Sequence, residues 1–170
     1  MNQLKSDEYP AIYATYIDTV VGDIKHVLEE QVESFPAFIG NIPKEKANFT
    51  YAEGKWTIKQ ILGHILDTER IMTYRALRFA RNDTKALTGF EEEDFVRNAH
   101  FDDFSFEFFA DSFTALRKSN LMLFDTFQDH ELSRKGLVSD RLITVRALLF
   151  VIGGHLNHHQ NIIQERYLKV

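Results

Sequence analysis

Three of the seven histidines in this 170-residue chain fall on the apolar faces of two expected helices. His155 and His159 are four residues apart, so on a helix their side chains leave one face about 6 Å apart and can close on one metal ion. Both continue an apolar row that includes Leu148 and Ile162, and His64 continues a second row on another helix. The pattern predicts that three imidazoles from two helices meet at one buried place and hold a divalent cation.

Three separate core histidines, each neutral and hydrogen-bonded, are the alternative to a metal centre. Burying a polar group without a partner costs on the order of 1 to 3 kcal/mol, and one shared metal ion satisfies three imidazoles together. Gly63, Gly153 and Gly154 directly precede these histidines. A glycine inside a helix costs about 0.5 to 1 kcal/mol relative to alanine, so these glycines indicate close approach of another segment. Ordinary tight packing explains the glycines equally well.

The other four histidines have weaker patterns. His26 lies off the apolar row of its helix, and His100 and His130 lie in expected loops, so we expect all three at the surface. His158 is rotated by about 100° from His159, which places it at the rim of the proposed centre. A role for His158 in proton transfer stays open.

Residue spacing narrows the metal chemistry. No histidine has a glutamate three residues before it, which excludes the Glu-x-x-His pairs of di-iron bundles. Leu156 stands where a His-Glu-x-x-His peptidase has its glutamate. Haem held by His64 and by His155 or His159 fits the spacing but leaves one histidine unexplained. The chain has no cysteine, which excludes disulfides, iron–sulfur ligation and a thiol nucleophile of its own.

Four amphipathic helices are expected to position the histidines. The apolar periods cover about residues 11–35, 57–81, 106–127 and 148–163, and no segment has the pattern of a strand. We expect Pro36 and Pro43 to end the first helix, and Thr57 with Gln60 to form a capping box at the start of the second. Helices of roughly 25 residues are about 35 to 40 Å long, which matches a four-helix bundle. The expected fold is all-α: one domain over residues 1–170, with mainly antiparallel helices and long connections, of which residues 83–104 are long enough to cross the bundle.

Composition and charge exclude other classes of protein. A net charge of −5 provides no basic field for nucleic acid. Residues 147–164 contain no charged side chain, but three histidines, two asparagines and two glutamines make them unsuitable as a membrane span. The sequence MNQLKSDEYP has no order of basic and apolar residues typical of an export signal, so we expect a cytoplasmic protein with no membrane partner.

Two stretches resemble a known family. The sequence KWTIKQILGHILDTER, which begins at Lys55, and the residues from Tyr74 to Arg81 are similar to the second helix of the DinB-like superfamily. Residues 145–148 and 153–159 resemble its last helix. The resemblance implies a four-helix bundle that binds one divalent metal, usually nickel or zinc, through His64, His155 and His159. It also implies a homodimer, and relatives described as metal-dependent hydrolases or as transferases of low-molecular-weight thiols.

The leading hypothesis is a metal-dependent enzyme. Three imidazoles leave a coordination position open for water, whose pKa falls toward about 7, or for a thiol that binds as thiolate. Since the chain has no cysteine, a thiol would arrive as a co-substrate beside a small-molecule substrate. The alternative is a non-catalytic metal-binding bundle with a role in assembly, sensing or stress response.

Two further features of the sequence stay open. A basic run on the second helix could neutralise an anionic substrate or form an ordinary solvated surface: Arg70, Arg75, Arg78 and Arg81. Asn120 interrupts the apolar row of the third helix, either as a polar contact in the metal cavity or as a buried amide that fixes helix register.

Overall fold

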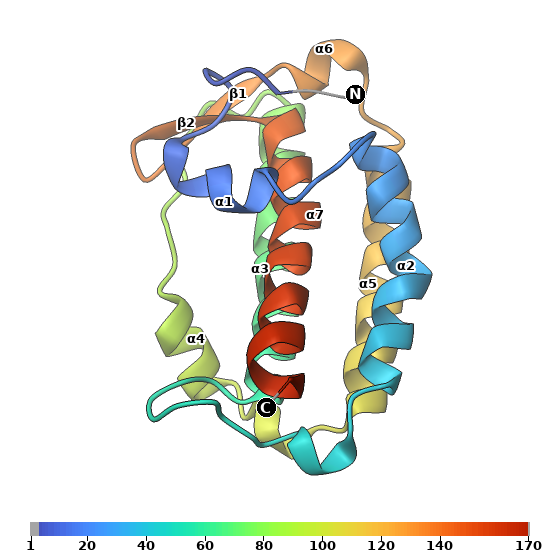
Figure 1. Cartoon of the computed structure of the whole chain (residues 1–170). Coiled ribbons are helices and arrows are strands. Elements are labelled where there is room, and N and C mark those ends of the chain that lie inside the picture. The colour runs from blue at the N-terminus through green and yellow to red at the C-terminus, as the bar shows by residue number, and fades with distance from the viewer. Residues whose placement is uncertain (1–3, 170) are drawn as a thin grey trace.

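Four long helices form the frame of the computed structural model, which describes residues 4–169 (Figure 1). They are α2 (Ile24–Gly40), α3 (Ile58–Ala80), α5 (Phe106–Phe124) and α7 (Val145–Ile162). The expected all-α four-helix bundle is confirmed. Short helical elements connect the frame: η1 (Ala11–Tyr13), α1 (Ala14–Ile17), η2 (Lys44–Lys46), α4 (Glu92–Asn98), η3 (Phe101–Asp103) and α6 (Asp129–Leu132). After α7 the chain continues as a π-helical turn, η4 (Ile163–Leu168).

Each long helix begins at a side chain that accepts hydrogen bonds from its first backbone N–H groups. Asp23, Thr57, Ser105 and Thr144 fill this position for α2, α3, α5 and α7. At α3 the capping box is present, since Thr57 accepts from the Gln60 N–H and the Gln60 side chain accepts from the Thr57 N–H. The sequence therefore marks the start of every helix in the frame.

The helices do not follow simple up-down-up-down order. α2 packs chiefly against the antiparallel α5, and α3 against the antiparallel α7. α3 and α5 run in the same direction, so the chain between them returns along the outside of the bundle and carries α4 on the way (Figure 1). The segment expected to be long enough to cross the bundle therefore does cross it.

The single first helix expected over residues 11–35 is wrong. Gly22 has a φ of +95°, which breaks the helix, and Asp23 caps a new one. The end expected at Pro36 is also wrong, because Pro36 lies inside α2. Phe35 and Ile39 on either side are only 1% exposed, so their packing holds the helical turn that proline disfavours.

A two-stranded hairpin corrects the expectation that the chain has no strand. β1 (Lys135–Val138) pairs in antiparallel register with β2 (Arg141–Thr144). Ser139 and Asp140 make the turn, both with positive φ, the conformation of a type I′ hairpin. These turn residues are not the Asn-Gly or Asp-Gly pair that signals such a hairpin, and the strands are only four residues long, so the sequence pattern was too weak to predict it.

Two apolar clusters fill the bundle, and a layer of buried polar side chains separates them. One cluster lies toward the hairpin and the other toward the opposite end, where α3 begins. The polar layer contains Gln31, His64, Glu69, Arg117 and His155. Among residues 4–169, no helix combines the length and the apolar character needed to cross a membrane.

Candidate metal centre

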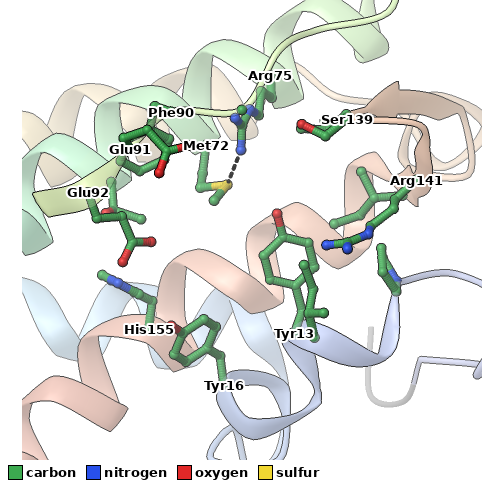
Figure 2. Close-up of a pocket in the computed structure, with 16 residues that line it drawn as sticks. Tyr13, Tyr16, Met72, Arg75, Phe90, Glu91, Glu92, Ser139, Arg141 and His155 are labelled. Atoms are coloured by element: carbon green, nitrogen blue, oxygen red, sulfur yellow. Dashed lines mark hydrogen bonds between the residues drawn. The ribbon is translucent and has the colours of Figure 1, made fainter. Parts of the chain in front are cut away.

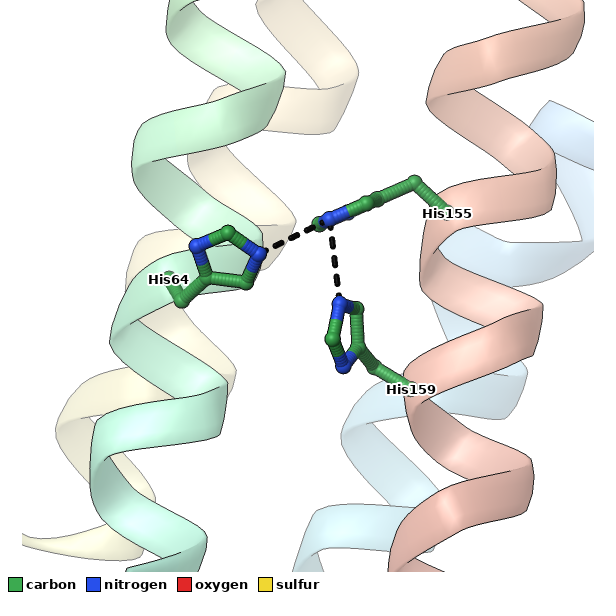
Figure 3. Close-up of side chains that lie close together, drawn as sticks. All are labelled: His64, His155 and His159. Carbon is green, nitrogen blue, oxygen red and sulfur yellow. Dashed lines mark hydrogen bonds between the residues drawn. The ribbon is translucent and has the colours of Figure 1, made fainter. Parts of the chain in front are cut away.

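The structure brings together the three histidines that the sequence singled out (Figure 3). His64 projects from α3, and His155 and His159 project from successive turns of the adjacent α7. The Nε2 atom of His155 lies 2.9 Å from Nε2 of His64 and 3.1 Å from Nε2 of His159. Ligand atoms of all three lie within 4.8 Å of one another.

Burial keeps these imidazoles neutral. His64 is 2% exposed and His155 is 3% exposed, while His159 is partly buried. Burial lowers the pKa of His64 from its ordinary value to about 4. Burial, reinforced by the neighbouring histidines, lowers the pKa of His155 and His159 well below the ordinary value. At neutral pH each ring therefore has a lone pair available for a metal ion.

The protein alone does not satisfy these rings. A neutral imidazole donates through one nitrogen and accepts through the other. Nε2 of His155 faces two other Nε2 atoms but can form only one good hydrogen bond in its ring plane. Nδ1 of His159 is buried and has no hydrogen-bond partner among residues 4–169. A cation at the meeting point of the Nε2 atoms would use three lone pairs at once, and imidazole nitrogen suits zinc and nickel. The residues present fit a divalent metal ion.

The remaining histidines lie at the surface or at the rim, as the sequence predicted, but His130 lies on the short helix α6 and not in a loop. His26, His100 and His130 are exposed. His158 is half-buried at the rim, with its ring 5.1 Å from the His159 ring and 5.2 Å from the Tyr16 ring. Its nitrogens are outside the three-histidine group.

Two glycines beside the histidines make room for covering segments. A Cβ on Gly154 would lie 2.1 Å from the backbone oxygen of Tyr16 in α1. A Cβ on Gly63 would lie 2.3 Å from the ring of Phe101 in η3. Glycine at these positions therefore lets α1 and η3 close over the two helices that carry the histidines.

A buried hydrogen-bond network holds α7 behind the centre. The Gln31 side-chain amide donates to the Gly153 carbonyl at 2.9 Å and to Asn157 Oδ1 at 2.8 Å. Arg117 donates to Gln31 Oε1 and forms two hydrogen bonds, of 2.7 and 2.8 Å, with the carboxylate of Glu69. This network ties α2, α3 and α5 to the turn of α7 that carries His155.

Asn120 belongs to this network. Its side-chain amide donates to Glu69 Oε1 at 3.0 Å. Of the two readings left open for Asn120, the buried amide that fixes the packing of neighbouring helices is the one the structure supports. The Glu69–Arg117 pair could not be predicted from the sequence, because two charged residues 48 positions apart carry no local pattern.

A cavity of about 390 Å³ opens beside the histidines. His155 forms part of its wall, together with Tyr16 from α1 and Glu92 from α4 (Figure 2). The Tyr16 and His155 rings are 5.1 Å apart in an edge-on contact. Burial raises the pKa of Tyr16, and the charge of Glu92 raises it further. A second hollow of about 190 Å³ reaches His159 from the side of Trp56.

The cavity has residues that the sequence did not reveal. Glu92 reaches it from the short helix α4, where no periodic pattern shows which way a side chain points. Tyr16 lies in the apolar period of residues 11–35, which predicts a core position and does not distinguish it from a cavity wall. Burial raises the pKa of Glu92, and the charges of Glu93 and Glu91 raise it further. The run of four adjacent acidic residues, Glu91 to Asp94, has the pattern of a solvated loop, so only the crossover topology identifies Glu92 as a cavity residue.

Comparisons with known proteins agree with this architecture. The model of the DinB superfamily matches residues 28–163. A solved structure, YfiT from Bacillus subtilis, is similar with a TM-score of 0.74 and 16% sequence identity, over 99% of this chain and 93% of that chain. YfiT is described as a probable metal-dependent hydrolase with an unusual four-helix bundle topology. A search of curated proteins found no match. Since the family model covers most of the sequence, the chain belongs to the DinB superfamily.

Proposed function

We propose that this protein binds one divalent cation, nickel or zinc, through His64, His155 and His159 and uses it to hydrolyse a small substrate or to transfer a low-molecular-weight thiol to one. The observation that carries the proposal is the convergence of three neutral imidazoles, one of which, His155, lines a cavity large enough for a small molecule. The description of YfiT as a metal-dependent hydrolase supports the same class of reaction.

A divalent cation on three imidazoles supplies Lewis acidity, which favours the deprotonated form of a water or thiol at neutral pH. The chain's own residues then have three tasks. The histidines stay neutral because they are buried. Tyr16 packs edge-on against the His155 ring and covers one side of it. Glu92 is the candidate proton acceptor, since its carboxylate lines the same cavity and is directed toward the side of His155 (Figure 2).

The absence of cysteine determines where the thiol of a transfer reaction would come from. A protein thiol cannot act as nucleophile or as carrier, so any sulfur enters as a free co-substrate. The two hollows, one at His155 and one at His159, offer separate approaches to the histidine group for two reactants. Hydrolysis needs only the larger cavity and water.

Metal content tests the first half of the proposal. Protein purified without added metal is analysed by mass spectrometry for nickel and zinc, beside His64→Ala and the exposed-site control His130→Ala. We expect close to one metal per chain in the parent and in His130→Ala, and little in His64→Ala. Equal metal in all three proteins would remove the proposed site.

Turnover tests the second half. Metal-loaded protein is incubated with model esters, amides and electrophiles, with and without several small thiols, and compared with His159→Ala. Product formation that needs both metal and His159 supports an enzyme, and dependence on thiol separates transfer from hydrolysis. Stoichiometric metal without turnover would favour the non-catalytic bundle in assembly, sensing or stress response.

The homodimer that family membership suggests belongs to the same proposal, as does a cytoplasmic location. Light scattering during size-exclusion chromatography measures the mass of the particle against the 19.8 kDa chain. A mass of one chain at micromolar concentration would exclude the dimer.

A further inference from the structure

Arg75 is a buried cation without an anionic partner. The residue is 4% exposed, and none of the carboxylates in residues 4–169 lies within 4.0 Å of its guanidinium. One terminal nitrogen donates to the Thr88 carbonyl at 3.0 Å and the other approaches the Met72 sulfur, a weak acceptor, at 3.4 Å. Burial lowers the pKa of Arg75, and only Tyr13 opposes this effect. Buried arginines are normally paired with a carboxylate of the protein. The unpaired guanidinium of Arg75 therefore favours binding of an external anion.

The other three arginines of the basic run each form an ion pair with a carboxylate of the protein. Arg70 pairs with Asp67, Arg78 with Asp83 and Arg81 with Glu131. For these three the ordinary surface interpretation holds. Arg75 alone among the four is buried, and it turns into the cavity.

The cavity is polarised along its length. Arg75 lies near Ser139 and Arg141 of the hairpin, and Glu92 lies toward His155 (Figure 2). His64 and Arg75 are eleven positions apart on α3, which corresponds to about 16 Å along the helix axis. Between them lies Thr68, which is 2% exposed and whose hydroxyl has no hydrogen-bond partner in the described part of the chain. The wall therefore offers the Arg75 cation at one end, the unused Thr68 hydroxyl in the middle and His155, the member of the histidine group that lines this cavity, at the other end.

We propose that the cavity binds an elongated substrate through a carboxylate, phosphate or sulfonate group held by Arg75, so that the opposite end of the molecule reaches the histidines. The inference rests on the proposed function for what happens at that end, but the anion site does not depend on it. Planar guanidinium groups recognise such oxyanions with paired hydrogen bonds. Arg141 at the hairpin adds a second positive charge.

Acidic and basic side chains lie at different places on the cavity wall. Glu92 enters from the start of α4 and lies toward His155 (Figure 2). Its carboxylate disfavours an anion beside it, whereas the charges of Arg75 and Arg141 favour one at the hairpin end. The proposed divalent cation at the histidines would also attract an anion, so the variant His64→Ala below distinguishes the two places.

Binding of simple aryl anions tests the inference without any turnover. Benzoate, phenylphosphonate and benzenesulfonate are titrated calorimetrically into the full-length protein, with benzamide as the neutral control. The three anions distinguish carboxylate, phosphoryl and sulfonyl chemistry. The variants are Arg75→Met, Arg75→Lys, the matched control Arg78→Met and the metal-site variant His64→Ala.

We expect at least one anion to bind one-to-one and benzamide not to bind. Arg75→Met loses a charge-assisted pair of hydrogen bonds, so we expect it to bind the anion at least about tenfold more weakly than the parent. Arg75→Lys keeps the charge but loses the paired N–H donors of the guanidinium, so we expect its affinity to lie between those of the parent and Arg75→Met. Arg78→Met and His64→Ala are expected to bind as the parent does. If Arg75→Met does not fold, Arg75→Lys decides the question.

Three results would overturn the inference. The first is that no anion binds, and the second is equal affinity in the parent and in the folded Arg75 variants. The third is that His64→Ala loses anion binding while Arg75→Lys binds as the parent does. The last would place the anion on the metal. A protein that holds no metal but binds an anion through Arg75 would refute the proposed function and leave this site standing.

Discussion

The indole ring of Trp56 lies 4.8 Å from the imidazole ring of His64. Trp56 is the single tryptophan of the chain, and its Nε1–H donates to Glu93 Oε2 at 3.0 Å. The fluorescence of the whole protein therefore reports on the proposed metal centre. We expect nickel, a paramagnetic quencher, to lower this fluorescence in a one-to-one titration and zinc to lower it far less. His64→Ala should abolish the nickel response, and an undiminished response in that variant would contradict ligation by His64.

Acid should destabilise the metal-free protein. The unfolded His64 binds a proton near pH 6.5, whereas the folded residue resists protonation until about pH 4, so the unfolded state gains protons first as pH falls. The stability present above pH 6.5 is lost between these values, by about 3 kcal/mol for this residue. Urea unfolding at pH 7, 6, 5 and 4 measures the loss, which should be smaller in His64→Ala than in the exposed-site control His26→Ala. A parent stability that does not change over this range would contradict burial of neutral histidines.

The buried pair of Glu69 and Arg117 should respond strongly to loss of one partner. Arg117 is 0% exposed, so Arg117→Met leaves the Glu69 carboxylate buried without its cation. We expect a loss of about 3 to 5 kcal/mol in the free energy of unfolding. The double variant Glu69→Met with Arg117→Met should be more stable than Arg117→Met alone, because it removes the stranded charge as well. Additive losses in urea denaturation would show that the two side chains are not coupled.

Gly154 should not tolerate a methyl group. The added Cβ would overlap the Tyr16 backbone oxygen and push α1 off α7, which predicts a loss of about 1 to 3 kcal/mol for Gly154→Ala. Gly40 is the matched control, since nothing lies within 4 Å of a Cβ added there. Thermal unfolding should show a lower Tm for Gly154→Ala and an unchanged or slightly higher one for Gly40→Ala. Equal behaviour of the two variants would mean that α1 is not held against the helix.

Glu92 should matter for turnover and little for folding. With a substrate identified by the turnover screen, Glu92→Gln should lower kcat by about 10²- to 10⁴-fold if the carboxylate accepts a proton. Burial and its acidic neighbours raise the pKa of Glu92, so the acidic limb of the pH–rate profile in the parent should lie above the ordinary glutamate value. Glu107→Gln, an exposed change on α5, is the control. An unchanged kcat and pH profile in Glu92→Gln would assign proton transfer to another group.

The long helices and the inward orientation of the three histidines were predictable because both follow from local periodicity, whereas the meeting of the histidines depends on the packing of α3 against α7. His64, His155 and His159 sit in apolar rows, and a side chain in such a row turns to the core whatever the order of the helices. The capping box at Thr57 fixed the start of α3 for the same reason, since its partners are three residues apart.

Features that depend on distant packing were not predictable. Only the structure distinguishes Arg75 from Arg78, because the difference lies in the hairpin and in residues 88–92, which cover one and not the other. The break at Gly22 was hidden because apolar spacing continues across it. Glu92 has the pattern of one of four adjacent surface acids until the direction of the crossover is known.

The parallel course of α3 and α5 obliges the chain to travel the length of the bundle between them, through a stretch that contributes little to the core. That stretch, with the N-terminal turns and the hairpin, lines the cavity, while the histidines stand on helices held from behind by the buried polar network. The crossover therefore supplies the Glu92 side of the cavity wall, whereas α3 carries both Arg75 and the proposed metal ligand His64. Grafting another crossover onto this frame would change the side of the cavity that Glu92 lines and leave Arg75 and the proposed metal ligands in place.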